Sequence, residues 1–151
     1  MVLKRAVSPL IATILLIALT ISIGAIVIGW GKQYVSTQTK CISADLQVIQ
    51  TTKGTNNIDI TVYNSGTIPL NINDLYIVAT AGTTTLTCQP GDPANVGANS
   101  CVIDNTGTTT INVGSQGTLN VVFGSGINVG DVSKMEVYMK GCSKTLALIV
   151  P

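Results

Sequence analysis

Residues Lys4–Trp30 read KRAVSPLIATILLIALTISIGAIVIGW, two cations followed by a long apolar segment without a charge. The uncharged run extends from Ala6 to Gly31, longer than the about 7–15 apolar residues of a secretory signal. A helix rises 1.5 Å per residue, so about 20 residues cross the roughly 30 Å hydrocarbon core of a bilayer. Ser8 and Pro9 suit an N-cap and a first helical turn. The segment therefore predicts a membrane-spanning helix that stays on the chain.

The residues at the two ends of this run predict its orientation. Lys4 and Arg5 precede it, and basic residues favour the cytoplasmic side of a membrane. Trp30 and Tyr34 follow it, at the position where aromatic side chains meet the lipid headgroups of the other side. We therefore expect a cytoplasmic N-terminus and an outer domain that contains the rest of the chain.

Four small residues of the run share one helical face, because they are spaced four, three and four apart: Ala18, Ser22, Ala25 and Gly29. Small residues let helix backbones approach closely in lipid. Gly and Ala are also common in any transmembrane helix, so composition alone is the competing explanation. We favour helix–helix packing as the role of this stripe. Gly24, Gly29 and Gly31 each cost about 1 kcal/mol relative to Ala in an exposed helix, which suggests either close packing or a flexible point before the outer domain. The flexible point is the alternative explanation of these glycines.

The composition outside this run excludes several classes of function. The chain has 151 residues, a net charge of +1 and only 10% charged residues. This near-neutral balance gives no reason to expect a nucleic-acid partner. A weakly charged surface protects poorly against self-association, which suits a subunit that packs against others. The chain has no histidine, the usual general base near neutral pH and the commonest metal ligand.

The acidic residues do not indicate a catalytic site. The seven acidic residues are Asp45, Asp59, Asp74, Asp92, Asp104, Asp131 and Glu136. No two of them have the spacing of a catalytic pair, and no glycine-rich phosphate-binding loop follows a predicted strand. Asp92 and Asp104 are candidates for calcium binding in loops, although ordinary turn roles explain both. We therefore expect a protein that is not an enzyme and that uses no cofactor and no metal.

From Ile42 onward, apolar and polar residues alternate as they do in β-strands. The clearest runs are Ile58–Tyr63, Leu75–Ala79, Thr118–Phe123, Lys134–Lys140 and Thr145–Val150. Turn signals separate the runs at intervals of about 8–12 residues, the pattern of an antiparallel sandwich. The triple-threonine runs Thr83–Thr85 and Thr108–Thr110 suit exposed strands and are also candidates for O-linked sugar. We predict an α+β protein in which a long N-terminal apolar helix precedes an antiparallel, immunoglobulin-like β-sandwich.

Four cysteines after an export-like segment predict two disulfides outside the reducing cytosol, and four cysteines allow three pairings. Cys88 and Cys101 bracket the Pro- and Gly-rich segment Gln89–Ser100, so a bond between them would close that loop. We prefer this pairing, which leaves Cys41 with Cys142. The second bond would attach the end of the apolar segment to the turn before the last strand. Free, buried thiols are the alternative.

The N-terminus closely resembles that of archaeal type IV pilins, through Lys4-Arg5-Ala6 followed by Val7-Ser8-Pro9-Leu10-Ile11-Ala12-Thr13-Ile14 and an uninterrupted apolar helix. Archaellins share this N-terminal region. Bacterial type IV pilins carry a Glu at the position of Ile11, so the resemblance favours the archaeal branch. In the family, a prepilin peptidase cuts after a small residue that follows a cation. The resemblance therefore implies a cut between Ala6 and Val7, next to Lys4 and Arg5.

The resemblance implies three segments: a leader over residues 1–6, an apolar helix over 7–40 and a β-sandwich over 41–151. It also implies a function as the major pilin of an archaeal type IV adhesion pilus, with the helices in the filament core and the β-domains outside. The implied partners are copies of itself, membrane lipid before assembly, the prepilin peptidase with the assembly machinery, and surfaces or other cells. The expected location is the cell surface. An archaellin of a motility filament and a single-span, membrane-anchored binding module remain as alternatives.

Overall fold

The computed structural model describes residues 3–107 and 109–151, with side chains described from residue 9 onward in the N-terminal helix. The chain divides into two compact units, one ending at Gln38 and one beginning at Thr39. Thr108, which belongs to one of the threonine runs, lies outside the described residues. The two units are described separately below.

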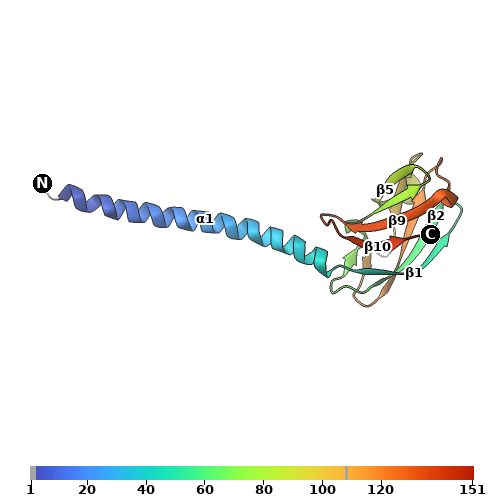
Figure 1. Ribbon diagram of the computed structural model, residues 1–151, viewed down its shortest axis with the longest axis horizontal. Helices are drawn as coiled ribbons and strands as arrows, with labels where there is room; N and C mark the ends of the chain where they lie inside the picture. The colour runs from blue at the N-terminus through green and yellow to red at the C-terminus, as the bar shows by residue number, and fades with distance from the viewer. Residues whose placement is uncertain (1–2, 108) are drawn as a thin grey trace. The chain divides into compact units, whose positions relative to one another are not determined.

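The N-terminal unit is formed by one helix, α1 (Leu3–Ser43), which continues for a few residues into the second unit (Figure 1). Its 41 residues correspond to a length of about 60 Å. The helix begins before Ser8, so Ser8 is not its N-cap and Pro9 lies inside it rather than in its first turn. Leu3, Lys4, Arg5 and Ala6 are good helix formers, so the helix extends through Pro9 even though Pro9 removes one backbone donor and crowds the carbonyl four residues earlier. The expectation for the helix start was therefore wrong.

The second unit contains an eight-stranded sheet that forms most of its structure (Figure 1). In spatial order the strands are β1 (Leu46–Lys53), β2 (Asn57–Asn64), β8 (Gln116–Phe123), β6 (Cys101–Asp104), β5 (Thr84–Gly91), β4 (Leu75–Ala81), β9 (Val132–Met139) and β10 (Thr145–Ile149). A second, two-stranded sheet pairs β3 (Leu70–Asn71) with β7 (Thr110–Ile111). Short 3₁₀ turns are η1 (Ile72–Asp74), η2 (Pro93–Asn95) and η3 (Val129–Asp131). The architecture is α+β, as the sequence predicts.

Strand β5 connects the two halves of the large sheet. Its first part, up to Cys88, pairs antiparallel with β4, while Gln89–Gly91 pairs parallel with β6. Every other pairing of strands among the described residues is antiparallel. The parallel pair differs from a purely antiparallel sandwich, and it arises because the segment after β5 returns to the same end of the sheet before β6 begins. One strand thus belongs to both halves.

The two halves of the sheet share one apolar core. On β2, the alternating residues Ile58, Ile60 and Val62 are fully buried. They join a single cluster with residues of the other half, among them Ile77 of β4 and Val137 of β9. Each buried side chain of this size contributes about 1.5–3 kcal/mol relative to exposure. The β-domain therefore has a complete core of its own.

A buried asparagine organises the turn after β2. Asn64 is 0% exposed. Its Nδ2 donates to the carbonyl oxygens of Ile68 and Ile111 at 2.9 and 3.0 Å, and its Oδ1 accepts from Gly66 N at 3.0 Å. A Cβ on Gly66 would lie 2.7 Å from Asp45 N and would also meet the carbonyl oxygen of Ser43. The turn therefore needs both a side chain with two donors and a residue without a side chain.

Two disulfides lie within the second unit. One joins Cys41, in the last turn of α1, to Cys142, in the turn before β10, across 101 residues of sequence. The other joins Cys88 of β5 to Cys101 of β6 across 13 residues. These are the two pairs preferred from the sequence. Cys88–Cys101 lies beside the parallel pairing and closes the loop that contains η2.

Candidate functional site

The most unusual surface of the molecule is the apolar side of α1, which the chain itself does not cover. The large apolar side chains from Leu10 to Val35 are between 51% and 71% exposed, with the lowest value at Ile11 and the highest at Ile26. None of the window of α1 that is long and apolar enough to cross a membrane is buried within the structure. A soluble monomer rarely exposes more than a few hundred Å² of contiguous apolar surface. This helix therefore requires a covering partner or lipid.

Four hydroxyl groups of α1 donate hydrogen bonds to backbone carbonyl oxygens of the same helix. Thr13 and Thr20 donate to the carbonyl oxygens three residues earlier, at 2.8 and 2.9 Å. Ser22 donates to the carbonyl oxygen of Ala18 at 2.8 Å, and Thr37 donates to that of Gln33 at 3.1 Å. In lipid every polar group needs an internal partner. These side chains can therefore enter an apolar environment without an unsatisfied donor.

The small-residue stripe predicted for helix packing lies on this exposed surface. Gly29 has no other atom within 4 Å of the place where a Cβ would be, and Ala18, Ser22 and Ala25 are exposed. The stripe offers a smooth face to a second helix, and its use for packing stays a prediction. Trp30 and Tyr34 stack with their ring centres 5.7 Å apart on another face.

The predicted processing site falls in the first turns of α1. The side chains of Lys4, Arg5, Ala6 and Val7 lie outside the described residues. Only the helical path of their backbone is described. The cut between Ala6 and Val7 therefore stays a prediction.

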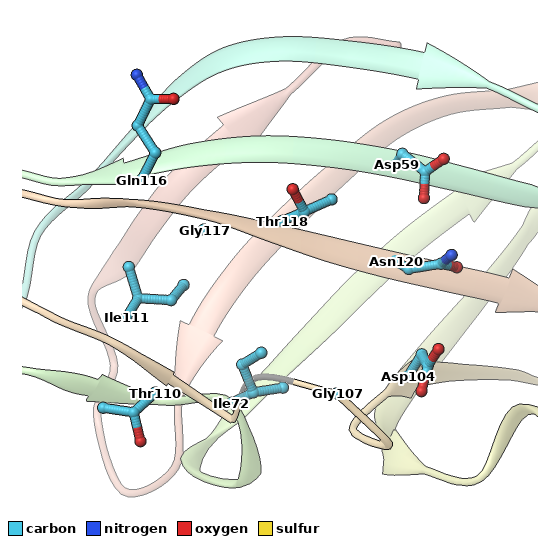
Figure 2. Close-up of a pocket in the computed structure, with 10 residues that line it drawn as sticks. All are labelled: Asp59, Ile72, Asp104, Gly107, Thr110, Ile111, Gln116, Gly117, Thr118 and Asn120. Atoms are coloured by element: carbon cyan, nitrogen blue, oxygen red, sulfur yellow. The ribbon is translucent and has the colours of Figure 1, made fainter.

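The β-domain carries a polar hollow on its outer surface (Figure 2). It has a volume of about 420 Å³. Asp59 of β2 and Asn120 of β8 are paired residues of adjacent strands, and Asp104 follows Ile103, which pairs with Val121. Figure 2 shows the carboxylates of Asp59 and Asp104 on either side of Asn120. The remaining lining residues come mainly from β7 and β8.

Both carboxylates of the hollow have protein partners. Asp59 Oδ2 accepts from Asn57 Nδ2 at 3.3 Å, and Asp104 Oδ1 accepts from the backbone N–H and the hydroxyl of Thr106 at 2.8 and 2.7 Å. Asn120 Oδ1 is buried without a protein partner among the described residues. Within that part of the chain, three or more His, Cys, Asp or Glu side chains do not come together. The described lining of the hollow therefore consists of two carboxylates, amide and hydroxyl groups, and the apolar side chains of Ile72 and Ile111.

The two aspartates considered for calcium do not share a site. Asp104 lines the hollow, whereas Asp92 caps η2, where its Oδ1 accepts from Ala94 N at 2.9 Å. Sequence reasoning missed the neighbourhood of Asp59, Asn120 and Asp104. The alternation places each residue outside the core, but only the pairing of β2, β8 and β6 brings the three together.

No family model and no curated protein matches the sequence. Two solved structures are similar in fold. The archaellum periplasmic stator protein complex FlaF and FlaG from Sulfolobus acidocaldarius has a TM-score of 0.51 and 9% identity, covering 70% of this chain and 88% of that one. The archaellum periplasmic stator protein FlaG from the same organism has a TM-score of 0.50 and 12% identity, covering 70% of this chain and 99% of that one. At these identities the likeness concerns the fold.

Proposed function

We propose that this chain is the major pilin of an archaeal type IV adhesion pilus, with α1 in the filament core and the β-domain outside. The observation that carries this proposal is a helix about 60 Å long whose large apolar side chains from Leu10 to Val35 are all exposed, attached to a domain with a complete core. The helix is about twice as long as a hydrocarbon core requires. A simple anchor would not need this surplus length.

The physical basis of assembly is an exchange of environments. In the precursor, lipid covers the apolar side chains of α1. After a cut between Ala6 and Val7, Pro9 becomes the third residue of the helix, where a missing N–H costs nothing. The helix then leaves the bilayer and its apolar surface is covered by the helices of other copies, at about 25 cal/mol per Å² relative to water. A contact of this kind that repeats without closing produces a filament.

The β-domain fits the outside of such a filament. Its exposed surface is mainly polar and weakly charged, and Thr83, Thr84 and Thr85 are exposed at the turn between β4 and β5. Two disulfides suit an oxidising, extracellular environment. Surfaces or other cells are the partners that we propose for this face.

The fold likeness supports a second candidate. The two similar structures are archaellum stator proteins, and one of them is a complex of two different proteins. A chain of this fold that remained singly in the membrane, bound to a different protein of a motility machine, would also need an apolar helix. An archaellin of the motility filament is the third candidate, because it shares the helix and its N-terminal pattern.

Intact mass and electron microscopy of material sheared from producing cells separate these candidates. We expect filaments whose subunit lacks Met1–Ala6. We also expect Ala6→Leu to abolish processing and leave an uncut precursor in the membrane, because the peptidase requires a small residue before its cut. Leu3→Ile, a volume-conserving change in the same leader, is the matched control and should be cut normally.

Recovery of the wild-type chain only from membranes, as single copies or bound to a different protein, would refute the pilin proposal. Filaments that rotate and drive swimming would favour the archaellin. Normal processing of Ala6→Leu would show that the cleavage site is not at Ala6. The filament proposal would then still be tested by microscopy of the sheared material.

A further inference from the structure

Three polar side chains of the hollow form one row across three strands of the β-domain (Figure 2). Asp59 of β2 lies opposite Asn120 of β8, and Asp104 of β6 continues the row on the other side of Asn120. All three are partly buried, whereas their strand neighbours Ile58 and Ile103 point into the core. The three side chains therefore share the outer face of the sheet. Two strand spacings separate the aspartates, which places their Cα atoms roughly 10 Å apart.

The two carboxylates of this row have no basic partner among the described residues. The residues that line the hollow include neither Lys nor Arg. Both ion pairs that the described residues form involve other carboxylates. Ile72 and Ile111, each 2% exposed, add apolar surface to the lining. Recessed carboxylates beside apolar side chains lose part of their hydration, so their negative charges need compensation from a bound group.

Each side chain of the row has an oxygen that accepts no hydrogen bond from the described residues. Asp59 accepts only through Oδ2, from Asn57, and Asp104 accepts only through Oδ1, from Thr106. Asn120 Oδ1 is buried and has no partner in this part of the chain. Buried acceptors are nearly always paired, so an unpaired one needs an explanation, and a bound ion is one of them. The row thus offers three free oxygens and two negative charges to a ligand.

A divalent cation matches these groups better than water does, because water would leave both negative charges uncompensated. Calcium binds carboxylate and amide oxygens in a flexible geometry, accepts about six to eight ligands and completes its shell with water. Magnesium requires a compact octahedral shell and gives up its own water reluctantly. The hollow has a volume of about 420 Å³ and its ligands stand on separate strands, so it leaves room for bound water. These properties favour calcium over magnesium.

We propose that the hollow binds one calcium ion, with Asp59, Asp104 and Asn120 Oδ1 as its protein ligands. This inference concerns the β-domain alone and does not rest on the pilin proposal. It departs from the expectation, drawn from the sequence, that the chain uses no metal, because the three ligands meet only through strand pairing. With two carboxylates and one amide, the site is comparable to the weak calcium sites of extracellular modules. We therefore expect a Kd on the order of 10⁻⁴–10⁻³ M.

Calcium titration of the full-length chain in detergent tests the site. Metal is first removed with a chelator, and thermal unfolding is then followed by circular dichroism at rising calcium concentration. We expect the melting temperature to rise by about 5 °C at about ten times the Kd, because a ligand that binds only the folded state stabilises it. Magnesium at the same concentration should cause a much smaller rise. Equal rises with the two cations, or no rise with calcium, would overturn the proposal.

The variants Asp59→Asn and Asp104→Asn separate ion binding from a purely structural role, because each removes one charge and keeps the size of the side chain. Without calcium, we expect both variants to be at least as stable as the wild-type chain, since repulsion along the row is reduced. With calcium, the wild-type chain should be the more stable, because the variants bind the ion at least tenfold more weakly. An equal loss of stability with and without calcium would show a structural role and overturn the proposal.

Asp92→Asn is the matched control, since Asp92 caps η2 outside the hollow and Asn keeps this role. It should retain the calcium response of the wild-type chain, and a loss as large as that of Asp59→Asn would overturn the site. Asn120→Asp adds a third carboxylate, so it should bind calcium several-fold more tightly and be less stable without it. Calcium binding by Asn120→Asp that is no tighter than in the wild-type chain would refute Asn120 as a ligand.

Discussion

At the scale of single residues, Asn64 has the most demanding position in the β-domain. It is fully buried, and its amide group donates two hydrogen bonds to carbonyl oxygens while accepting one from Gly66. Two of these bonds link the turn after β2 to Ile68, just before β3, and to Ile111, the last residue of β7, and the third lies within the turn. Asp has nearly the same volume as Asn but, when ionised, has no donor, so it cannot make the two hydrogen bonds to the carbonyl oxygens.

We predict that Asn64→Asp lowers the free energy of unfolding by about 3 kcal/mol or more, because a buried carboxylate would face two carbonyl oxygens that have lost their donor. Thermal or denaturant unfolding of the purified chain measures the loss. Asn71→Asp is the matched control: the Asn71 Oδ1 accepts from Asn73 N at 2.9 Å, a role that a carboxylate keeps. Similar stability of the two variants would contradict the structural role of Asn64.

At the scale of structural elements, the two disulfides constrain very different lengths of chain. Cys88–Cys101 closes a separation of 13 residues between adjacent strands, whereas Cys41–Cys142 closes 101 residues and attaches the last turn of α1 to the segment before β10. In the chain-entropy account, the longer loop restricts the unfolded state more strongly. The two bonds should therefore contribute unequally to stability.

Replacing Cys41 and Cys142 together by Ala should lower stability by about 4–5 kcal/mol, against about 3 kcal/mol for Cys88 and Cys101. Denaturant unfolding of the two double variants, compared with the wild-type chain, measures the difference. Equal losses, or a larger loss for Cys88 and Cys101, would show that local packing between β5 and β6 outweighs the loop length.

At the scale of the whole molecule, the only tryptophan lies on the apolar helix. Trp30 is 70% exposed and stacks on Tyr34, and it follows Pro9 by a helical rise of about 30 Å. This rise matches a hydrocarbon core, so a helix that starts at one membrane surface would place Trp30 at the other. The native fluorescence of the chain therefore reports directly on the environment of α1.

We predict that the full-length precursor, reconstituted in lipid vesicles, shows Trp30 emission at shorter wavelength than the unfolded chain. Lipids brominated near the headgroup should quench it more than lipids brominated at the ends of their acyl chains, because the ring lies at the interface. Stronger quenching by the deeper bromines would place Trp30 inside the hydrocarbon. The absence of quenching by either lipid would contradict membrane insertion.

Features that depend on residues close together along the chain can be predicted from the sequence. An uncharged run of this length can only be a helix in an apolar environment, and the alternation of Ile58, Ile60 and Val62 places these residues in the core of any sheet. The spacing of Cys88 and Cys101 around a loop likewise favoured the observed pairing.

Features that depend on strand order could not be predicted from the sequence and become visible in the folded domain. The parallel pairing of β5 with β6, the burial of Asn64 and the meeting of Asp59, Asn120 and Asp104 all join residues far apart in sequence. Local alternation states which side of a strand faces the core, but it does not state which strand lies next to it. That choice comes from the closure of loops and the packing of one shared core, which are properties of the whole domain.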